Sequence, residues 1–180
     1  DGITYAKGAS TLKQLVSYVG FDTFIEAARV YFKRFAWGNT SLQDFLDVLN
    51  EVSGRDMQTW SQAWLQTSGL STLGTRRVYR EDGKLQDLYL TQQLPDTQPA
   101  GIGRPHVVKL ETFILQEEKL VSTGTLSLEY PADPIAEYRV SLPQEHKKTV
   151  GEADLLMLNA EDHTYAKIRS EEHTSELQSR

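Results

Sequence analysis

The chain has 180 residues, 39% of them hydrophobic and 24% charged, a composition typical of a soluble globular protein with one domain or two small ones. It contains no cysteine, which excludes disulfide bonds and thiolate zinc sites. Its formal net charge of −6, with no stripe of Lys and Arg, gives nucleic-acid binding no electrostatic support, and no apolar run is long enough to span a membrane.

The start of the chain predicts that it is part of a longer protein. The sequence opens at Asp1 with neither a Met nor a signal peptide, so we expect the native N-terminus to lie upstream. The lack of cysteine fits a cytoplasmic protein.

The end of the chain differs in character from the rest. Residues 169–180 read RSEEHTSELQSR, and 169–179 resemble the translation of a sequencing-adapter oligonucleotide. We therefore exclude 169–180 from the fold as an artefact. We expect this segment to pack against nothing, because Leu177 is its only large apolar residue. Its Glu172, His173 and Glu176 imitate a metal cluster at helical spacing and are not interpreted as ligands.

The first seventy residues carry four apolar stripes with a period of three or four residues, which predicts four amphipathic helices. The stripes span residues 9–19, 24–35, 42–52 and 57–64. Gly20 should end the first helix, and a capping box of Thr23 and Glu26 should start the second. The third helix should start near Thr40 or Ser41 and stop at Gly54. Asp56 should cap the fourth helix, which should end at Gly69.

The helical period disappears near residue 73, and short β-prone runs separated by turns follow. Asp82-Gly83 lies between two such runs and predicts a hairpin. Further runs are found at 106–116, 119–121, 125–130, 137–142 and 155–158. Several short strands at close spacing predict a small antiparallel β-sandwich. The expected fold class is α+β, with a helical part followed by the sandwich, and a fifth long helix between residues 75 and 142 would contradict it.

The segment most informative about function is Ile-Thr-Tyr-Ala-Lys-Gly at 3–8, which stands just before the first predicted helix. It resembles the Tyr-x-Lys-Gly segment of the aminopeptidase N family, the gluzincin-type zinc aminopeptidases with an HExxH motif. The resemblance continues at AWGN (36–39), SGRD (53–56), 60–73, LLMLN (155–159) and TYAKI (164–168). It covers most of 1–168, is weakest over 75–152, and is strongest to the actinobacterial type.

This resemblance implies a domain organisation. Residues 1–73 would be the helical end of a thermolysin-like catalytic domain, 74–160 a β-sandwich domain, and 161–168 the start of a truncated helical C-terminal domain. The parent protein would be a metalloprotease that hydrolyses N-terminal residues from peptides, with zinc as its cofactor. The HExxH motif is absent here, and the family's third ligand and amine-binding segment would lie upstream. The chain alone is therefore expected to bind no metal and to be inactive.

The resemblance also implies one catalytic residue. Peptide hydrolysis passes through a tetrahedral oxyanion, and a phenolic O–H directed at that oxygen stabilises the developing charge. Tyr5 matches the family tyrosine with this role; the alternative is an ordinary half-buried tyrosine at a helix start. Lys7 and Gly8 match the motif but receive no chemical role. Gly8 is expected to permit close packing. A structural ion pair is one candidate role for Lys7, which the sequence does not decide.

The remaining candidate residues are expected to be structural. His106, His146 and His163 each fall in a predicted strand or loop, and none has another His three to five residues away. Trp60 and Trp64 lie one helical turn apart and are expected in the core. The polar face of the third helix should carry solvated charge rather than paired catalytic carboxylates: Asp44, Asp47 and Glu51.

Two other functional classes stay open. The chain could be a non-catalytic interaction module of helices plus a sandwich, or an α+β domain with no site of its own. The position of Tyr5 separates them, because a catalytic role needs its hydroxyl at an open surface and a binding module favours burial. The expected partners are peptide substrates of the parent, with no nucleic acid and no membrane, and the oligomeric state is left open.

We predict that the dialysed chain contains far less zinc than protein on a molar basis. A lone His with scattered carboxylates does not make a tetrahedral zinc site. Metal analysis measures the ratio, and a stoichiometric, tightly held zinc would mean that the three histidines have been misinterpreted.

Overall fold

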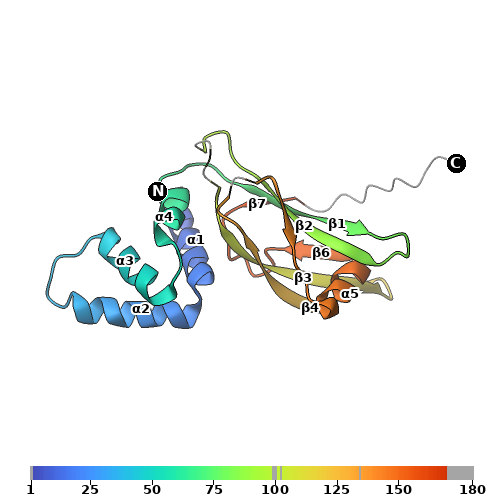
Figure 1. Ribbon diagram of the computed structural model, residues 1–180, viewed down its shortest axis with the longest axis horizontal. Helices are drawn as coiled ribbons and strands as arrows, with labels where there is room; N and C mark the ends of the chain where they lie inside the picture. Colours follow the sequence, from blue (N-terminus) through green and yellow to red (C-terminus); the bar gives the residue numbers. More distant parts are fainter. Residues whose placement is uncertain (1, 99–100, 102, 134, 170–180) are drawn as a thin grey trace.

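The computed structural model describes residues 2–98, 101, 103–133 and 135–169, with side chains from residue 7 onward (Figure 1). Four helices precede two sheets and a fifth helix. The helices are α1 (Gly2–Val19), α2 (Phe21–Arg34), α3 (Leu42–Ser53), α4 (Met57–Leu65) and α5 (Gln144–Glu152). The strands are β1 (Thr72–Tyr79), β2 (Leu85–Gln93), β3 (His106–Gln116), β4 (Lys119–Tyr130), β5 (Glu137–Val140), β6 (Leu155–Leu158) and β7 (Lys167–Ile168). The predicted α+β fold class is confirmed.

The predicted starts of α3 and α4 and the predicted end of α3 are confirmed by their caps, whereas α4 ends at Leu65 and not at the predicted Gly69. The Ser41 hydroxyl accepts a hydrogen bond from the Asp44 backbone N–H, and the Asp44 carboxylate accepts one from the Ser41 N–H. Gly54 ends α3 in the left-handed conformation with φ 65°. The Asp56 carboxylate accepts a hydrogen bond from the Thr59 N–H at 3.0 Å and so caps α4.

The predicted starts of α1 and α2 are wrong. α1 begins at Gly2, so the segment 3–8 lies inside the helix rather than before it. α2 begins at Phe21 with Gly20 as its N-cap, and no side chain caps it. Gly20 adopts φ 89°, which turns the chain within one residue, so Thr23 already lies inside the first turn and cannot act as a cap.

The helical part has its own hydrophobic core. α2 and α3 pack together, and the rings of Phe24 and Tyr31 meet Phe45 edge to face, with centroids 5.9 and 5.2 Å apart. Trp60 and Trp64 are 1% and 4% exposed, which confirms their predicted place in the core.

Two sheets form the sandwich. One has the strand order β5-β2-β1-β7 and the other β4-β3-β6, and all pairs are antiparallel except β1 with β7. Leu73 and Leu88 of the first sheet share one core with Leu110 and Leu128 of the second. The 119–121 and 125–130 runs form a single strand, β4, whose pairing with β3 shifts by one residue next to Gly124.

Helix α5 was not predicted from the sequence. It begins after Pro143, and Val150 is its only buried residue. The period of apolar residues that marks the other helices is therefore missing from it. It lies outside the 75–142 range in which a long helix would have contradicted the expected division.

The last described residues extend the sheet. β7 pairs in parallel with β1, and the Arg169 N–H donates a hydrogen bond to the Leu73 carbonyl at 2.8 Å. The expectation that 169–180 packs against nothing is thus wrong at its first residue, because a backbone hydrogen bond does not depend on the side chain. Residues 170–180, including Glu172, His173 and Glu176, lie outside the described residues. The assignment of 161–168 to a following domain stays a prediction.

A buried cation joins the helical part to the sandwich. Arg104 is 2% exposed and donates hydrogen bonds to the carbonyls of Ala63 and Gly69, at 3.2 and 2.9 Å. Its guanidinium lies 5.2 Å from the ring centroid of Trp64. The Trp64 indole N–H donates to the Pro105 carbonyl at 2.8 Å. Burial lowers the pKa of Arg104, but an arginine stays charged at neutral pH, so these acceptors stabilise a buried charge.

His106, beside this cation, is completely buried. Its ring lies edge-on to Trp64 at 4.9 Å, and its Nδ1 lies 2.6 Å from the Thr164 hydroxyl. Its Nε2 has no hydrogen-bond partner among the described residues. Burial first, and then the charge of Arg104, lower the pKa of His106 to about 3, so the folded chain holds a neutral imidazole.

We predict that His106 makes the chain less stable as the pH falls from about 6.5 towards 3. An unfolded histidine takes up a proton near pH 6.5, whereas His106 in the folded chain does so only near pH 3. The unfolded state therefore binds one more proton in this window, which lowers the unfolding free energy by up to about 1.4 kcal/mol per pH unit. Urea unfolding at several pH values between about 4.5 and 6 measures this slope. Most Asp side chains are already ionised in this range, so they contribute little to it.

His106→Gln should reduce that pH slope by about one proton, whatever it does to absolute stability. His146→Gln, on α5, is the comparison variant, because it removes a histidine that is only partly buried. Equal slopes in the wild type and His106→Gln would contradict a neutral, buried His106.

Candidate functional site

The three residues that match the family motif lie in the first two turns of α1: Tyr5, Lys7 and Gly8. The side chain of Tyr5 lies outside the described residues, so its exposure does not yet separate the catalytic role from the binding-module alternative. Lys7 is half-buried, and its carbonyl accepts a hydrogen bond from the Thr11 hydroxyl at 2.9 Å. Within the described part of the chain Lys7 forms no ion pair, so no structural partner for it is found there.

The expected close packing at Gly8 is wrong for the described part of the chain. A Cβ placed on Gly8 would meet no atom within 4 Å, and the residue is exposed. The space beside Gly8 is open because no described element passes over this part of α1.

This open space belongs to a wider helix face. By the helical period, positions 5, 8, 9 and 12 share one side of α1. Gly8 and Ala9 are exposed, and Leu12 keeps 53% of its surface exposed. The positions nearest to residue 5 on its own face are therefore uncovered.

The opposite side of α1 is fixed to both parts of the molecule. Leu15, Tyr18 and Val19 enter the helical core. Gln14 is completely buried, and its side-chain amide forms hydrogen bonds with β3 and with the loop before β7. Its Oε1 accepts from the Val107 N–H at 2.6 Å, and its Nε2 donates to the carbonyls of Val107 and His163, both at 3.0 Å. Figure 1 shows α1 where the helical part meets the sandwich.

Gln14 was missed at the sequence level. The available signal was a long polar residue next to Leu15, inside the stripe that the helical period assigns to the core. Such a residue needs partners for three polar groups when it is buried. The partners are backbone groups 93 and 149 residues away, which no local pattern reveals.

A second connection, nearer the surface, involves the SGRD segment. Arg55 forms a two-bond ion pair with Glu129 of β4, at 2.7 and 3.3 Å, and its guanidinium lies 4.3 Å from the Tyr18 ring centroid. The hydrogen bond with Glu129 raises the pKa of Arg55. Because the two side chains remain 34% and 50% exposed, this pair stabilises the junction less than its geometry suggests.

The histidines of the described part of the chain do not assemble a metal site. His106 is in the core at the start of β3, and His163 lies in a loop with its Nε2 3.0 Å from the Glu161 carboxylate. His146 lies on α5, so its expected place in a strand or loop is wrong. No group of three or more His, Cys, Asp or Glu in the described part of the chain could hold a metal ion. These residues therefore do not fit the zinc that the resemblance implies.

The carboxylates of α3 are structural, as expected. Asp44 completes the capping box, and Asp47 accepts a hydrogen bond from Gln43 at 2.7 Å. Glu51 forms a two-bond pair with Arg34, at 3.0 and 3.1 Å. Hydrogen bonds from these partners lower the pKa of Asp44 and Glu51. A general acid would need the opposite shift.

Comparison with known proteins places these features in a family context. Residues 1–67 match the model of the Peptidase family M1 domain. The chain is 41% identical to Aminopeptidase N of Streptomyces lividans over 182 residues, covering 97% of this chain and 20% of that protein. It is 32% identical to Aminopeptidase M1-D of Oryza sativa subsp. japonica, covering 54% of this chain and 11% of that protein. The chain thus spans about a fifth or less of these relatives.

A solved structure supports the fold independently. The crystal structure of Legionella pneumophila aminopeptidase A in complex with aspartic acid matches 93% of this chain and 18% of its own, with a TM-score of 0.66 and 17% identity. At that identity the match concerns the fold alone. None of the described helices has the length and apolar character needed to cross a membrane.

The similarity to Aminopeptidase N covers 97% of the chain and so includes both the helical part and the sandwich. The family model covers the helix that carries Tyr5, Lys7 and Gly8. The chain therefore has the resemblance to the aminopeptidase N family, the aminopeptidases of peptidase family M1, that its motifs predicted.

Proposed function

We propose that this chain is part of a zinc aminopeptidase that removes N-terminal residues from peptides. The observation that supports this most directly is the 41% identity to an aminopeptidase N along 97% of the chain. Because the chain covers 20% of that relative, the activity is assigned to a longer protein that contains it. In the same proposal, the catalytic domain ends with residues 1–73, the sandwich domain is formed by 74–160, and a further domain begins at 161–168. The longer protein is proposed to be cytoplasmic.

The role proposed for this chain is to supply Tyr5. Charge develops on an oxygen as the peptide bond is attacked, and a preorganised O–H donor at that oxygen stabilises the transition state more than the substrate. An unperturbed tyrosine has a pKa near 10 and keeps its proton at neutral pH. The uncovered face around Gly8, Ala9 and Leu12 supports this role, because a donor must reach a substrate outside this chain.

Zinc is proposed for the longer protein and not for this chain. The sequence has no HExxH segment, and the described residues contain no group of three potential ligands. The metal ligands would then come from residues outside 1–180, and the chain by itself would bind no zinc and hydrolyse no aminoacyl substrate.

We predict that Tyr5→Phe in the longer enzyme lowers kcat about a hundredfold to a thousandfold. The change removes one oxygen and almost no volume, so packing should survive. The lost interaction is made mainly in the transition state, so KM should change little. Steady-state hydrolysis of an aminoacyl anilide measures both constants, and metal analysis of the same samples should show unchanged zinc.

Tyr138→Phe is the matched control, since Tyr138 is exposed on β5 of the sandwich. It should keep wild-type kcat. If Tyr5→Phe also kept near-normal kcat with full zinc occupancy, the catalytic role of Tyr5 would be wrong.

A further inference from the structure

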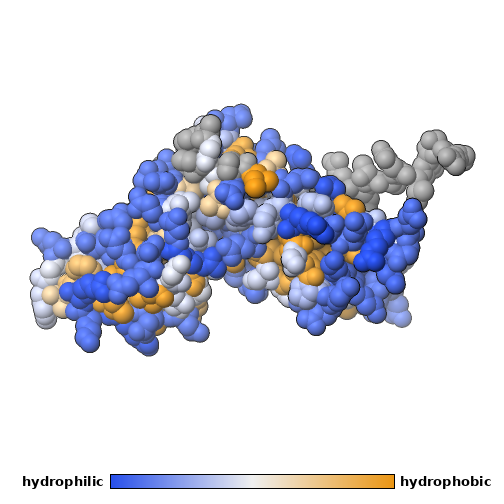
Figure 2. Space-filling view, in the orientation of Figure 1, coloured by the Kyte–Doolittle hydropathy of each residue, from blue (hydrophilic) through white to orange (hydrophobic). Residues whose placement is uncertain are grey.

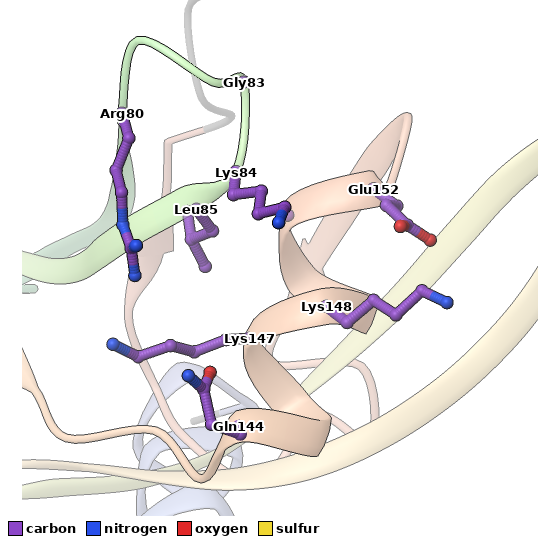
Figure 3. A pocket seen from close by; sticks show the side chains of 9 residues that line it. Arg80, Gly83, Lys84, Leu85, Gln144, Lys147, Lys148 and Glu152 are labelled. Carbon is purple, nitrogen blue, oxygen red and sulfur yellow. The ribbon is translucent and has the colours of Figure 1, made fainter.

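A basic pocket lies on the sandwich, between the β1–β2 hairpin and α5, and does not involve α1 (Figure 3). It has a volume of about 370 Å³. Two of the cations that line it, Arg80 and Lys84, come from the hairpin, and two, Lys147 and Lys148, come from α5. Glu152 is its one acidic lining residue. The pocket thus has an excess of positive charge, although the chain as a whole has a net charge of −6.

The cationic groups do not all face the same way. In Figure 3 the side chains of Arg80 and Lys147 extend from opposite walls toward one another, and the Gln144 amide lies beside Lys147. Lys148 and Glu152 extend from the other side of α5, so the carboxylate does not neutralise the Arg80 and Lys147 pair. Figure 2 shows that the end of the molecule with the hairpin and α5 is mainly hydrophilic.

The walls of the pocket are held in place by contacts that do not use these cations. Arg77 donates to the carbonyls of Val150 and Ala153 at 3.1 and 2.6 Å, and the Tyr79 hydroxyl donates to the Gly151 carbonyl at 3.1 Å. A Cβ on Gly151 would come within 2.8 Å of the Leu85 Cβ, so α5 lies as close to β2 as a glycine permits. The pocket is therefore formed before any ligand arrives.

The converging cations lack anionic partners. Within the described ranges, no hydrogen bond or ion pair joins the Arg80 side chain to another residue, and Lys147 has one polar contact, with the Gln86 carbonyl at 3.1 Å. Lys84 is 3.9 Å from Asp82, and both side chains are at least half exposed, so this pair is weak. Two cations that face each other across a fixed hollow repel one another, and an anion between them removes that repulsion.

We propose that this pocket binds a small polyanion through its phosphate or carboxylate groups. The Arg80 guanidinium offers a planar fork that matches two oxygens of such a group, and Lys147 adds a point charge from the opposite wall. Gln144 adds an amide donor, and its position as the first residue of α5 places it at the positive end of the helix dipole. A ligand with two charged groups can contact the cations of both walls at once, whereas a single chloride ion cannot.

The experiment titrates the 180-residue chain with pyrophosphate, and separately with citrate, at constant ionic strength set with sodium chloride. Backbone amide chemical shifts should change in a saturable way at Gly83, Lys84 and Gly151. Arg80→Gln combined with Lys147→Gln should weaken binding at least about tenfold. Arg29→Gln combined with Lys33→Gln, in α2, removes the same charge far from the pocket and should change affinity less than about twofold.

The two probes separate the possible ligands. Saturation by pyrophosphate alone would identify a phosphate compound, saturation by citrate alone a polycarboxylate, and saturation by both a general oxyanion site. Because Lys147 also bonds to Gln86, Arg80→Gln alone is a second test in which the fold keeps all its described contacts. The proposal is overturned if neither probe saturates, if the shifts occur elsewhere, or if the α2 variant loses as much affinity as the pocket variant.

Discussion

The buried amide of Gln14 is the interaction on which the position of α1 depends. A glutamine side chain away from water must satisfy one acceptor and two donors, and here all three are satisfied by backbone groups of β3 and of the loop before β7. Leaving any of these groups without a partner costs about 1–3 kcal/mol, so rotation or sliding of α1 against the sandwich is opposed at several points at once. Arg104 and Trp64 restrain the end of α4 in the same way.

The parts of the fold that could be predicted from the sequence are those with local causes. Ser41, Gly54 and Asp56 act within three residues of themselves, and the strands of the sandwich are bounded by turns. Two of the errors in the predicted helices also have physical causes. Thr23 has the right spacing for a cap, but Gly20 starts the helix earlier, and α5 lacks an apolar stripe because a single residue, Val150, anchors it.

In the candidate site, too, the residues with a local signal could be predicted and those with distant partners could not. The motif segment pointed to Tyr5, Lys7 and Gly8 without any knowledge of their surroundings, because the resemblance rests on local sequence. The residues that hold α1 could not be found in this way, since the partners of Gln14 and Arg104 are distant in sequence and are mostly backbone groups. The two walls of the basic pocket, the β1–β2 hairpin and α5, are likewise separated in sequence by three strands and become a site only in three dimensions.

The connections that Gln14 and Arg55 make between the helical part and the sandwich respond differently to solution conditions. The Arg55–Glu129 pair is partly exposed, so salt screens it. The hydrogen bonds of Gln14 are uncharged and buried, so salt has little effect on them. The backbone that carries Tyr5 therefore keeps its orientation relative to β3 over a wide range of ionic strength, as long as the sandwich itself is folded. If Tyr5 acts in catalysis as proposed, the sandwich is then the reference frame for that residue and not merely a neighbouring domain. A mutation that loosens β3 would misplace the donor without touching the site, because a shift of about 1 Å is enough to lose most of the benefit of a positioned group.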